Sequence, residues 1–386
     1  MNLTTEQPDL KRALTLLKPA VAAKSTLPAL SHVQLQAEEG QLRLAATDLS
    51  IALMVWIKAD VNEPCGMCMP FGLLADLTGA LPDRPIQWWH TEETQTMRLL
   101  CTLQHEANIK GIAFGEFPTL PAIDAAPLLT IASDELSRAL DQVVYAAASD
   151  DTRPALAGVH IRIEPQRIVF STSDGFRAGR SAIQLDQPID GITEPIELLP
   201  QADALAVLVG ILRGQDGKPL AIRRIGDSFV AFDVSDAAGV ARFVLIARLI
   251  DGRYPELDRM IPSDFESRLV IDRAALVKAV KIASFFALAS ANIVRLAFEA
   301  TEDGPGMVKI TANAAEVGNN RSEVDSIVHG NRGRMALNVK FLAETLEVLT
   351  SNQVAIESQG EQYAAVFRPV GDEATLHILM PMTVRE

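Results

Sequence analysis

The chain repeats one arrangement three times, and this repeat limits its fold more than any single motif does. Each copy opens with a strand and an amphipathic helix, continues with strands and a second helix, and closes with strands. The first helix of each copy carries apolar residues at helical spacing: Leu10, Ala13, Leu14, Leu17 and Val21, then Leu136, Leu140, Val143, Val144 and Ala147, then Leu276, Ala279, Val280 and Ala283. The repeat predicts three tandem α+β domains.

The strands show the same repetition. Alternation of apolar and polar residues, which is typical of strands with one buried face, runs through His32–Leu44, Val159–Phe170 and 293–310. A second apolar stripe follows each of these segments. The six helices are therefore predicted at 9–21, 70–81, 133–148, 200–213, 272–289 and 339–350.

Two proline-containing segments separate the copies, GEFPTLP at 115–121 and DGRYPELDRMIP at 251–262. Proline restricts the backbone, and Phe117 or Tyr254 offers a ring that can dock on a domain, so we expect ordered linkers. We place the three domains at 1–124, 125–262 and 263–386, which are ordinary domain sizes.

Composition excludes several classes of protein. At 48% hydrophobic and 22% charged residues the chain is globular, and its longest apolar run, 204–212, is too short to cross a bilayer. The first residues, MNLTTEQPDL, lack the basic and then apolar layout of a secretion signal. Three cysteines suit a reducing compartment, and we therefore expect a cytoplasmic protein.

The motifs of catalysis and metal binding are missing. Cys65 and Cys68 form one CxxC, which cannot fill the four positions of a structural zinc site, and no HExxH, GxSxG or GxxxxGK[ST] occurs. We expect no metal and no cofactor.

Asp48 in ATDLS and Asp174 in STSDGFR recur at equivalent places, where we expect them to accept backbone N–H groups at a strand end. A hydrolytic role for these two carboxylates is the enzyme hypothesis.

Several of these segments together resemble the bacterial sliding clamp, the beta subunit of DNA polymerase III. They are KSTLPAL (24–30), ATDLS, GEFPTLP, DDTRPALAGV (150–159), TSDGFR, LIDGRYPELDRMIP and the terminal HILMPM (377–382). The resemblance covers nearly the whole chain. Each motif alone is weak, but their order and their spacing across three repeats make the combination specific.

The resemblance implies a ring-forming homodimer. In that family, two chains of three clamp domains join head to tail, the helices line a central hole, and antiparallel sheets form the outside. Such a ring encircles double-stranded DNA without reading its sequence and confers processivity on the polymerase that it tethers. It is no enzyme. The implied partners are the DNA polymerase III catalytic subunit, the clamp loader, and other polymerases and repair proteins that bind through short peptide motifs, with no membrane involved.

The distribution of charge agrees with this role. The predicted helices carry nine basic and nine acidic residues, so the whole net charge of −14 falls outside them. An acidic exterior repels DNA while a neutral or basic lining tolerates it. By resemblance Lys24 and Arg153 contact DNA. Placement on a helix adds further candidates: Lys11, Arg12, Arg138, Lys278, Lys281 and Lys340. The second helices of the first two domains are almost bare of positive charge.

The resemblance also implies a pocket for partner peptides between the second and third domains. Methionines and prolines would form an adaptable apolar floor, and arginines would line its rim. The matching residues are Leu156, Ser173, Gly175, Phe176, Arg177, Pro255, Arg259, Met260, Gln362, Ala364, Met380, Pro381 and Met382.

For the dimer, we expect Phe285 and Phe286 to face Ala107 and Ile109 of the partner chain. Two adjacent phenylalanines point in different directions on a helix, so at least one of them leaves its own core. Besides the enzyme hypothesis, a third hypothesis is a clamp-like scaffold that binds peptides without encircling DNA, which the sparse basic lining would suit.

Overall fold

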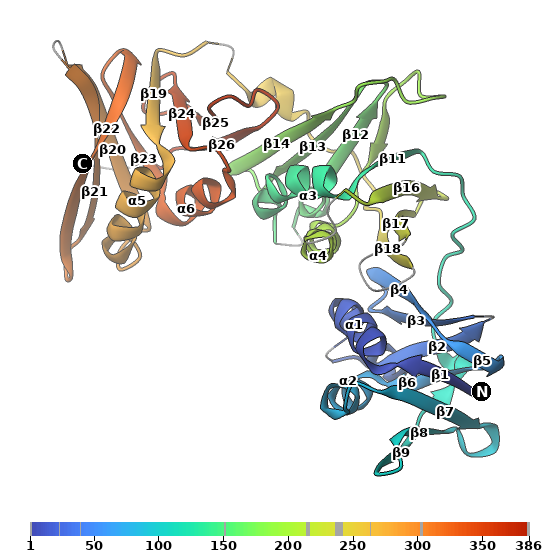
Figure 1. Cartoon of the computed structure of the whole chain (residues 1–386). Helices are drawn as coiled ribbons and strands as arrows, with labels where there is room; N and C mark the ends of the chain where they lie inside the picture. Colours follow the sequence, from blue (N-terminus) through green and yellow to red (C-terminus); the bar gives the residue numbers. More distant parts are fainter. Residues whose placement is uncertain are drawn as a thin grey trace. The chain divides into compact units, whose positions relative to one another are not determined.

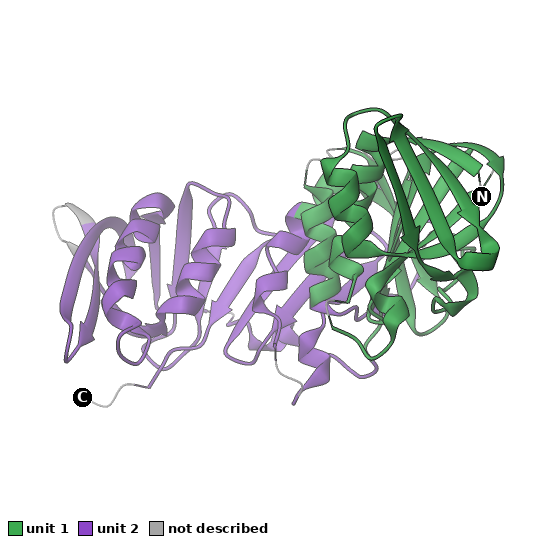
Figure 2. Ribbon diagram, turned by 90° about the horizontal axis from the view of Figure 1, so that it is seen from below, with its two compact units in different colours: residues 1–137, 203–250 green, residues 138–202, 251–386 purple. Residues whose placement is uncertain are grey.

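The computed structural model describes residues 2–22, 24–38, 40–149, 152–213, 217–235, 242–262, 264–301 and 304–383 (Figure 1). These residues form two compact units. Unit 1 comprises 1–137 and 203–250, and unit 2 comprises 138–202 and 251–386 (Figure 2). Each helix that the structure describes is too short or too polar to span a bilayer.

Unit 1 contains two antiparallel sheets and the helices α1 (Gln7–Leu17) and α2 (Phe71–Ala80), which pack against each other. The smaller sheet has the order β5 (Asp60–Glu63), β1 (Asn2–Glu6), β7 (Pro85–Thr91), β8 (Thr96–Thr102), β9 (His105–Lys110). The larger sheet has the order β10 (Ile112–Ala113), β6 (Gly66–Pro70), β2 (His32–Glu38), β3 (Gln41–Thr47), β4 (Ile51–Lys58), β18 (Arg242–Arg248), β17 (Phe229–Ser235), β16 (Pro219–Ile225), β11 (Leu129–Ala132).

Unit 2 is built on one continuous antiparallel sheet of twelve strands, with α5 (Arg273–Ala287) and α6 (Val339–Val348) packed together. Its order is β15 (Ile196–Leu198), β12 (His160–Glu164), β13 (Arg167–Ser173), β14 (Arg177–Gln184), β26 (Leu376–Leu379), β25 (Ala365–Pro369), β24 (Gln353–Ser358), β19 (Ser267–Asp272), β22 (Gly318–Gly330), β21 (Gly304–Ala314), β20 (Ile293–Thr301), β23 (Gly333–Asn338). Two more helices, α3 (Ser133–Asp141) and α4 (Ala202–Leu212), include residues of both units.

The same kind of strand joint occurs once in each unit. In unit 1, β18 pairs antiparallel with β4, from Arg242 opposite Trp56 to Ala247 opposite Ile51. In unit 2, β26 pairs antiparallel with β14, from Leu376 opposite Arg180 to Leu379 opposite Arg177. In both joints the last strand of one copy of the repeat pairs with the third strand after the first helix of the preceding copy. Backbone hydrogen bonds thereby make each sheet continuous from one copy to the next.

The alternation in the sequence produces the expected burial. In β12, Ile161 and Ile163 are fully buried, while the residues between and beside them are half-exposed. The α+β class and the three copies of a two-helix unit are confirmed. In β4, IALMVWIK, alternation fails because both faces are covered, one of them by a cluster that includes Met54 and Ile246. Leu120 and Ile123 of the linker pack against this cluster, which confirms an ordered linker.

Two predicted helices are too long. The first was expected at 9–21, but α1 ends at Leu17 and a 3-10 turn follows over Lys18–Ala20. Pro19 has no N–H to continue the α-helical ladder. The third was expected at 133–148, but α3 ends at Asp141, and the Thr172 hydroxyl donates to the Val143 carbonyl just beyond that end. At the start of α5 the side chain of Asp272 caps the helix, as its position predicts.

A buried histidine lies in the joint of unit 2. His377, in β26, is fully buried, and its Nδ1 lies 3.0 Å from the hydroxyl of Tyr145. That hydroxyl also lies 3.0 Å from Thr345 Oγ1. Burial lowers the pKa of His377 to about 3, against a weaker upward influence of Asp372. The ring therefore stays neutral in the folded chain down to a strongly acidic pH.

This histidine makes the stability of the chain depend on pH. The unfolded chain protonates His377 below about pH 6.5 and the folded chain does not, so the free energy of unfolding falls as the pH falls through the window between 6.5 and 3. Between pH 7 and 5 we expect His377→Gln to remove about 2 kcal/mol of this loss. Denaturant titrations at both pH values would measure it. The exposed His329→Gln is the matched control, and equal losses in all three proteins would contradict the assignment.

Candidate nucleic-acid and partner-binding surfaces

One polar turn organises the joint in unit 2. Asp174 Oδ1 accepts hydrogen bonds from the backbone N–H groups of Phe176 (2.8 Å) and Arg177 (2.9 Å). Ser173 Oγ donates to the Arg177 carbonyl and accepts from Gly175 N. Gly175 has a φ of +91°, which glycine adopts without strain. The turn thus presents Phe176 outward, with 61% of its surface exposed.

Unit 1 contains the same turn between β3 and β4. Asp48 Oδ1 accepts from Ser50 N (2.8 Å) and Ile51 N (2.9 Å), and Thr47 takes the place of Ser173. The expectation that Asp48 and Asp174 accept backbone N–H groups at a strand end is confirmed. Leu49 occupies the position of Gly175, at a φ of +78°. The enzyme hypothesis loses support because the turns use these carboxylates.

Arg177 connects this turn to the last helix. Its side chain is only 11% exposed, its Nε lies 3.0 Å from Asp174 Oδ2, and its guanidinium pairs with Glu344 of α6. The same guanidinium lies over the rings of Tyr145 (5.2 Å) and Phe341 (4.5 Å). Sequence reasoning found Arg177 but missed these three neighbours, because they lie in other parts of the chain and in no shared motif.

The expected peptide pocket is partly assembled around this turn. The Phe176 carbonyl accepts from Met380 N at 2.8 Å, so the two side chains lie next to each other. Phe176, Met260 and Met380 are exposed by 61%, 44% and 39%. Pro255 and Arg259 are exposed on the linker, where Arg259 pairs with Glu256 at 2.7 Å. Several of the residues expected in the peptide pocket are therefore exposed in unit 2.

Other predicted pocket residues lie elsewhere. Leu156 and Ser173 are 7% and 3% exposed, so they support the turn from inside and offer little surface to a ligand. Gln362, Pro381 and Met382 line a separate cavity of about 460 Å³, while Ala364 next to it is half-buried. Met382 N donates to the Ala336 carbonyl at 2.8 Å and thereby ties the end of the described chain to β23.

The side chain of Arg153 contacts the polar turn that presents Phe176. Its Nη2 donates to the Asp174 carbonyl at 2.8 Å, and its guanidinium fills the space beside Gly175, where an added Cβ would lie 2.6 Å away. Arg153 was expected to contact DNA. Its side chain also contacts the turn that presents Phe176, and its contact with DNA stays a prediction.

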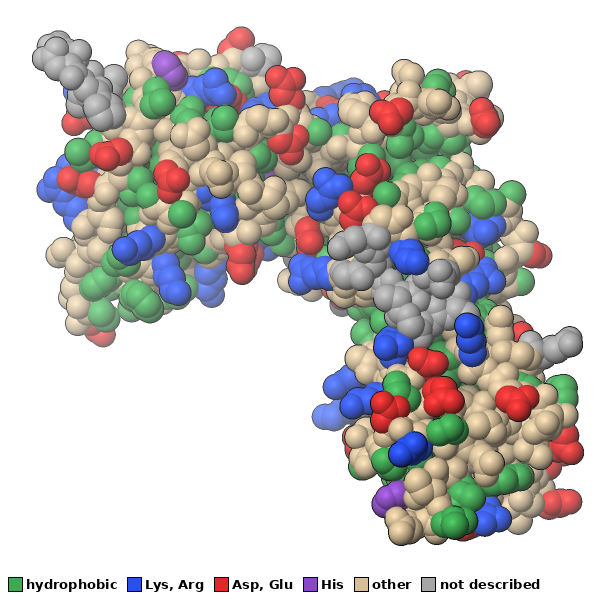
Figure 3. Space-filling view, in the orientation of Figure 1, with side chains coloured by type: hydrophobic (Ala, Val, Ile, Leu, Met, Phe, Trp, Pro, Cys, Tyr) green, Lys and Arg blue, Asp and Glu red, His purple; other side chains and the backbone are tan. Residues whose placement is uncertain are grey.

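The other predicted DNA-contacting cations are all exposed: Lys11, Arg12, Lys24, Arg138, Lys278, Lys281 and Lys340. Lys278 and Lys281 share one face of α5, opposite the buried stripe of that helix. Arg12 pairs with Asp9 at 3.3 Å, whereas no carboxylate in the described part of the chain pairs with Lys11, Lys278 or Lys281. Figure 3 shows Lys and Arg side chains gathered beside α1 and around α5 and α6.

Two helices offer almost no positive charge. The exposed residues of α2 include Leu73 and Asp76, and those of α4 include Asp203 and Ala206. Neither α2 nor α4 contains Lys or Arg, and Arg213 follows directly after the end of α4. The sparse basic lining expected from the sequence is therefore a feature of the folded chain.

The predicted dimer residues fall into two groups. Phe285 is 66% exposed, whereas Phe286 packs against the core of unit 2, in contact distance of Gly318 at the start of β22. Ala107 is half-buried on β9. Ile109 is only 3% exposed and faces the buried Met97 across the strand pair, so its side chain offers little surface, and its role in the dimer stays a prediction.

The cysteines form no metal site in the part of the chain that the structure describes, where no group of three His, Cys, Asp or Glu side chains converges. Cys68 lies in β6, where burial raises the pKa of its thiol to about 12. Cys65 Sγ lies 3.1 Å from His90 Nδ1.

Comparison with known proteins agrees with this architecture. Three sequence profiles of the DNA polymerase III beta subunit match consecutive parts of the chain: the N-terminal domain at 1–121, the central domain at 130–256 and the C-terminal domain at 258–383. The chain belongs to the DNA polymerase III beta subunit family. The three profiles confirm the three tandem clamp domains.

Similar proteins cover the full length. The chain is 27% identical to the beta sliding clamp of Synechocystis sp., over 99% of both chains, and 24% identical to that of Staphylococcus aureus, over 94% of both. In fold it is similar to the DNA polymerase sliding clamp of Bacillus subtilis (TM-score 0.90, 20% identity) and to the DNA polymerase III subunit beta of Pseudomonas aeruginosa (TM-score 0.88, 23% identity), over the whole of each chain.

The two copies of the turn allow a matched test of the Arg177 ion pair. Asn at either position keeps an oxygen that accepts the turn amides, but Asp174→Asn also removes the carboxylate that pairs with Arg177, whereas Asp48 forms no ion pair with any described residue. We expect Asp174→Asn to cost about 1–2 kcal/mol, which lowers the melting temperature by about 3–6 °C. Thermal unfolding should show a smaller effect for Asp48→Asn, and equal shifts would contradict this role.

Proposed function

We propose that this chain is a DNA sliding clamp, a ring that encircles duplex DNA and tethers the polymerase and other DNA enzymes to it. Its function depends on its topology, and it carries out no reaction of its own. Family membership supports this proposal along the full length of the chain. Because such a clamp acts on chromosomal DNA, we also propose that the protein works in the cytoplasm.

A repeated strand joint supports the proposed ring. Within the described residues the chain forms this joint twice, and the two strands that could form it a third time do not pair with each other. The joints are β4·β18 and β14·β26. Like β4 and β14, β22 is the third strand after the first helix of its copy. Like β18 and β26, β9 is the third strand after the second helix of its copy. Within the described ranges, β9 pairs only with β8, and residues 318–325 of β22 pair only with β21. Each chain therefore offers the two halves of a third joint.

These two edges complement each other between chains. Pairing β9 of one chain with β22 of a second repeats the internal joint, and two such contacts close a head-to-tail homodimer. Edge strands with unpaired N–H and C=O groups favour addition of another strand. Phe285 supports the same contact, because it is exposed on α5, the helix that packs against β22.

DNA would contact the exposed faces of the helices. Lys11 and Arg12 on α1 and Lys278 and Lys281 on α5 would meet phosphates, with further contributions from Lys24, Arg138 and Lys340. Contacts of this kind depend on the phosphate backbone and not on the bases, so sliding would not depend on sequence. The domain limits that we propose remain 1–124, 125–262 and 263–386.

The pocket around Phe176 and Met380 would bind short peptide motifs of partner proteins. The partners that we propose are the DNA polymerase III catalytic subunit, the clamp loader, and other polymerases and repair proteins. Three exposed apolar side chains provide contact area, and the cations Arg153 and Arg259 lie at the rim. Methionine side chains can adapt to several different peptides.

Enclosure of DNA has a direct experimental signature. We expect the chain, once loaded onto nicked circular DNA, to stay with the circle through gel filtration in high salt and to leave after a restriction cut. Ionic binding would weaken steeply with salt, whereas enclosure would not. Loss from intact circles together with continued binding of partner peptides would contradict the clamp and favour the non-encircling scaffold.

The dimer contact can be tested at Phe285. Replacing both Phe285 and Phe286 by aspartate should give monomers in light scattering. Because Phe286 packs in its own core, the single Phe285→Asp is the variant less liable to unfold, and we expect it to weaken dimerisation at least tenfold. Leu73→Asp, at a 56% exposed position on α2, is the control. Dimers that persist at micromolar concentration would contradict the interface.

A further inference from the structure

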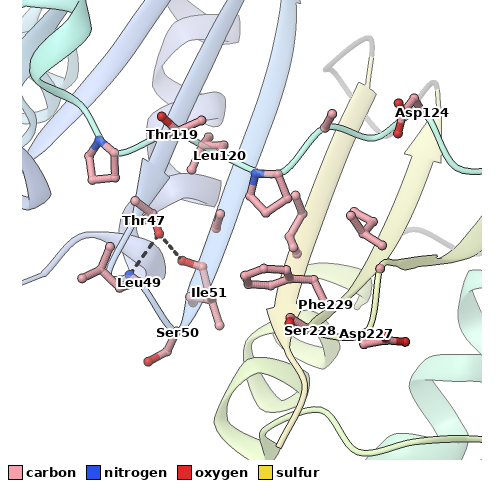
Figure 4. Close-up of a pocket in the computed structure, with 17 residues that line it drawn as sticks. Thr47, Leu49, Ser50, Ile51, Thr119, Leu120, Asp124, Asp227, Ser228 and Phe229 are labelled. Atoms are coloured by element: carbon pink, nitrogen blue, oxygen red, sulfur yellow. Dashed lines mark hydrogen bonds between the residues drawn. The ribbon is translucent and has the colours of Figure 1, made fainter.

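A second pocket lies in unit 1, at the joint between β4 and β18. It has a volume of about 550 Å³, and its apolar lining includes Leu49, Pro118, Leu120, Pro121, Ile225 and Phe229. Figure 4 shows Leu49 on the β3–β4 turn, Leu120 on the linker, and the Phe229 ring pointing toward Ile51. Three separate segments of the chain thus converge on one apolar hollow.

This pocket is the structural equivalent of the surface around Phe176 and Met380. Both lie beside the same polar turn, with the hydrogen bonds of Thr47 and Asp48 matching those of Ser173 and Asp174. In unit 2, Met380 N donates to the carbonyl of Phe176, and in unit 1, Arg248 N donates to the carbonyl of Ser50 at 3.1 Å. The proline-containing linker 115–121 borders the unit 1 pocket through Pro118, Leu120 and Pro121. Two copies of the repeat therefore form equivalent turns at equivalent strand joints.

Leu49 makes the pocket in unit 1 unusual. A leucine at a φ of +78° holds its backbone in a conformation that favours glycine, and the equivalent position of unit 2 is Gly175. The side chain is nevertheless 51% exposed. The strained backbone of Leu49 and the exposure of its apolar side chain both cost free energy in the unbound chain. A residue that a ligand covers could have both features.

Charge distinguishes the two sites. The described lining of the unit 1 pocket contains the carboxylates Asp124 and Asp227 and neither Lys nor Arg. Asp227 already pairs with Arg224 at 2.7 Å, so Asp124 is the lining carboxylate that forms no ion pair with any described residue. The surface in unit 2 instead carries Arg153 and Arg259 at its rim. A ligand of the unit 1 pocket should therefore carry positive charge next to its apolar side chains.

We propose that the unit 1 pocket is a second peptide-binding site, specific for an extended segment of a partner protein that has two adjacent bulky apolar residues followed by lysine or arginine. The apolar pair would pack on Leu49, Leu120 and Phe229, and the cation would face Asp124. This inference rests on the proposed function in one respect, because it takes the equivalent surface of unit 2 to be a peptide pocket. One clamp could then bind two kinds of partner at once.

The test uses two fluorescent hexapeptides in anisotropy titrations, Ala-Gln-Leu-Phe-Lys-Lys and Ala-Gln-Leu-Phe-Glu-Glu. Phe176→Asp blocks the unit 2 surface. Leu49→Gly removes the apolar contact from the unit 1 pocket and relieves the backbone, so the variant should fold. In the Phe176→Asp background we expect the lysine peptide still to bind and the additional Leu49→Gly to weaken it about tenfold. Leu103→Gly, at a 99% exposed turn position in the same unit, should change nothing.

The outcomes separate this inference from the proposed function. If Phe176→Asp alone abolishes binding of both peptides, the unit 2 pocket stands and the second site is overturned. If the glutamate peptide binds the Phe176→Asp variant as well as the lysine peptide does, the charge specificity is wrong. If neither variant changes binding of either peptide, both pocket assignments fail. Retention on circular DNA tests the clamp independently of all three outcomes.

Discussion

Backbone hydrogen bonding across the joints between repeats is the interaction on which this structure depends. In β4·β18 and β14·β26 the last strand of one repeat completes the sheet of its neighbour, so a polar edge that would otherwise face water is satisfied. The joint has a direction along the chain. In both joints the later repeat contributes its last strand, and the earlier repeat accepts that strand at the opposite edge of its own sheet. Within the described residues, the unpaired edge of β9 and the unpaired side of residues 318–325 of β22 follow from that direction.

The two copies of the polar turn show how a repeated framework acquires different sites. The aspartate and the hydroxyl residue that shape the turn are retained, while the residues that it presents differ. Arg177 stands where unit 1 has Ile51, and it brings an ion pair with Glu344 and two ring contacts to that joint. The backbone geometry is common to both copies, whereas charge and exposed apolar area are set separately in each.

Much of the fold could be predicted from the sequence, because apolar periodicity reports burial directly. The stripes of α1 and α5 and the alternation in β12 lie where the sequence indicated. The end of α3 could not be predicted, since it depends on a hydrogen bond from Thr172, 29 residues away from Val143. For the same reason the neighbours of Arg177 remained hidden, because Glu344 lies far from Arg177 in the chain.

The bare faces of α2 and α4 have a consequence for motion along a duplex. Each phosphate contact holds a protein in a local energy minimum, and translocation requires several such contacts to break together. In the proposed ring, few cations on these helices would make the energy minima along the DNA shallower and would lower the friction that opposes sliding. Confinement would then keep the protein on its track while diffusion along that track stays fast.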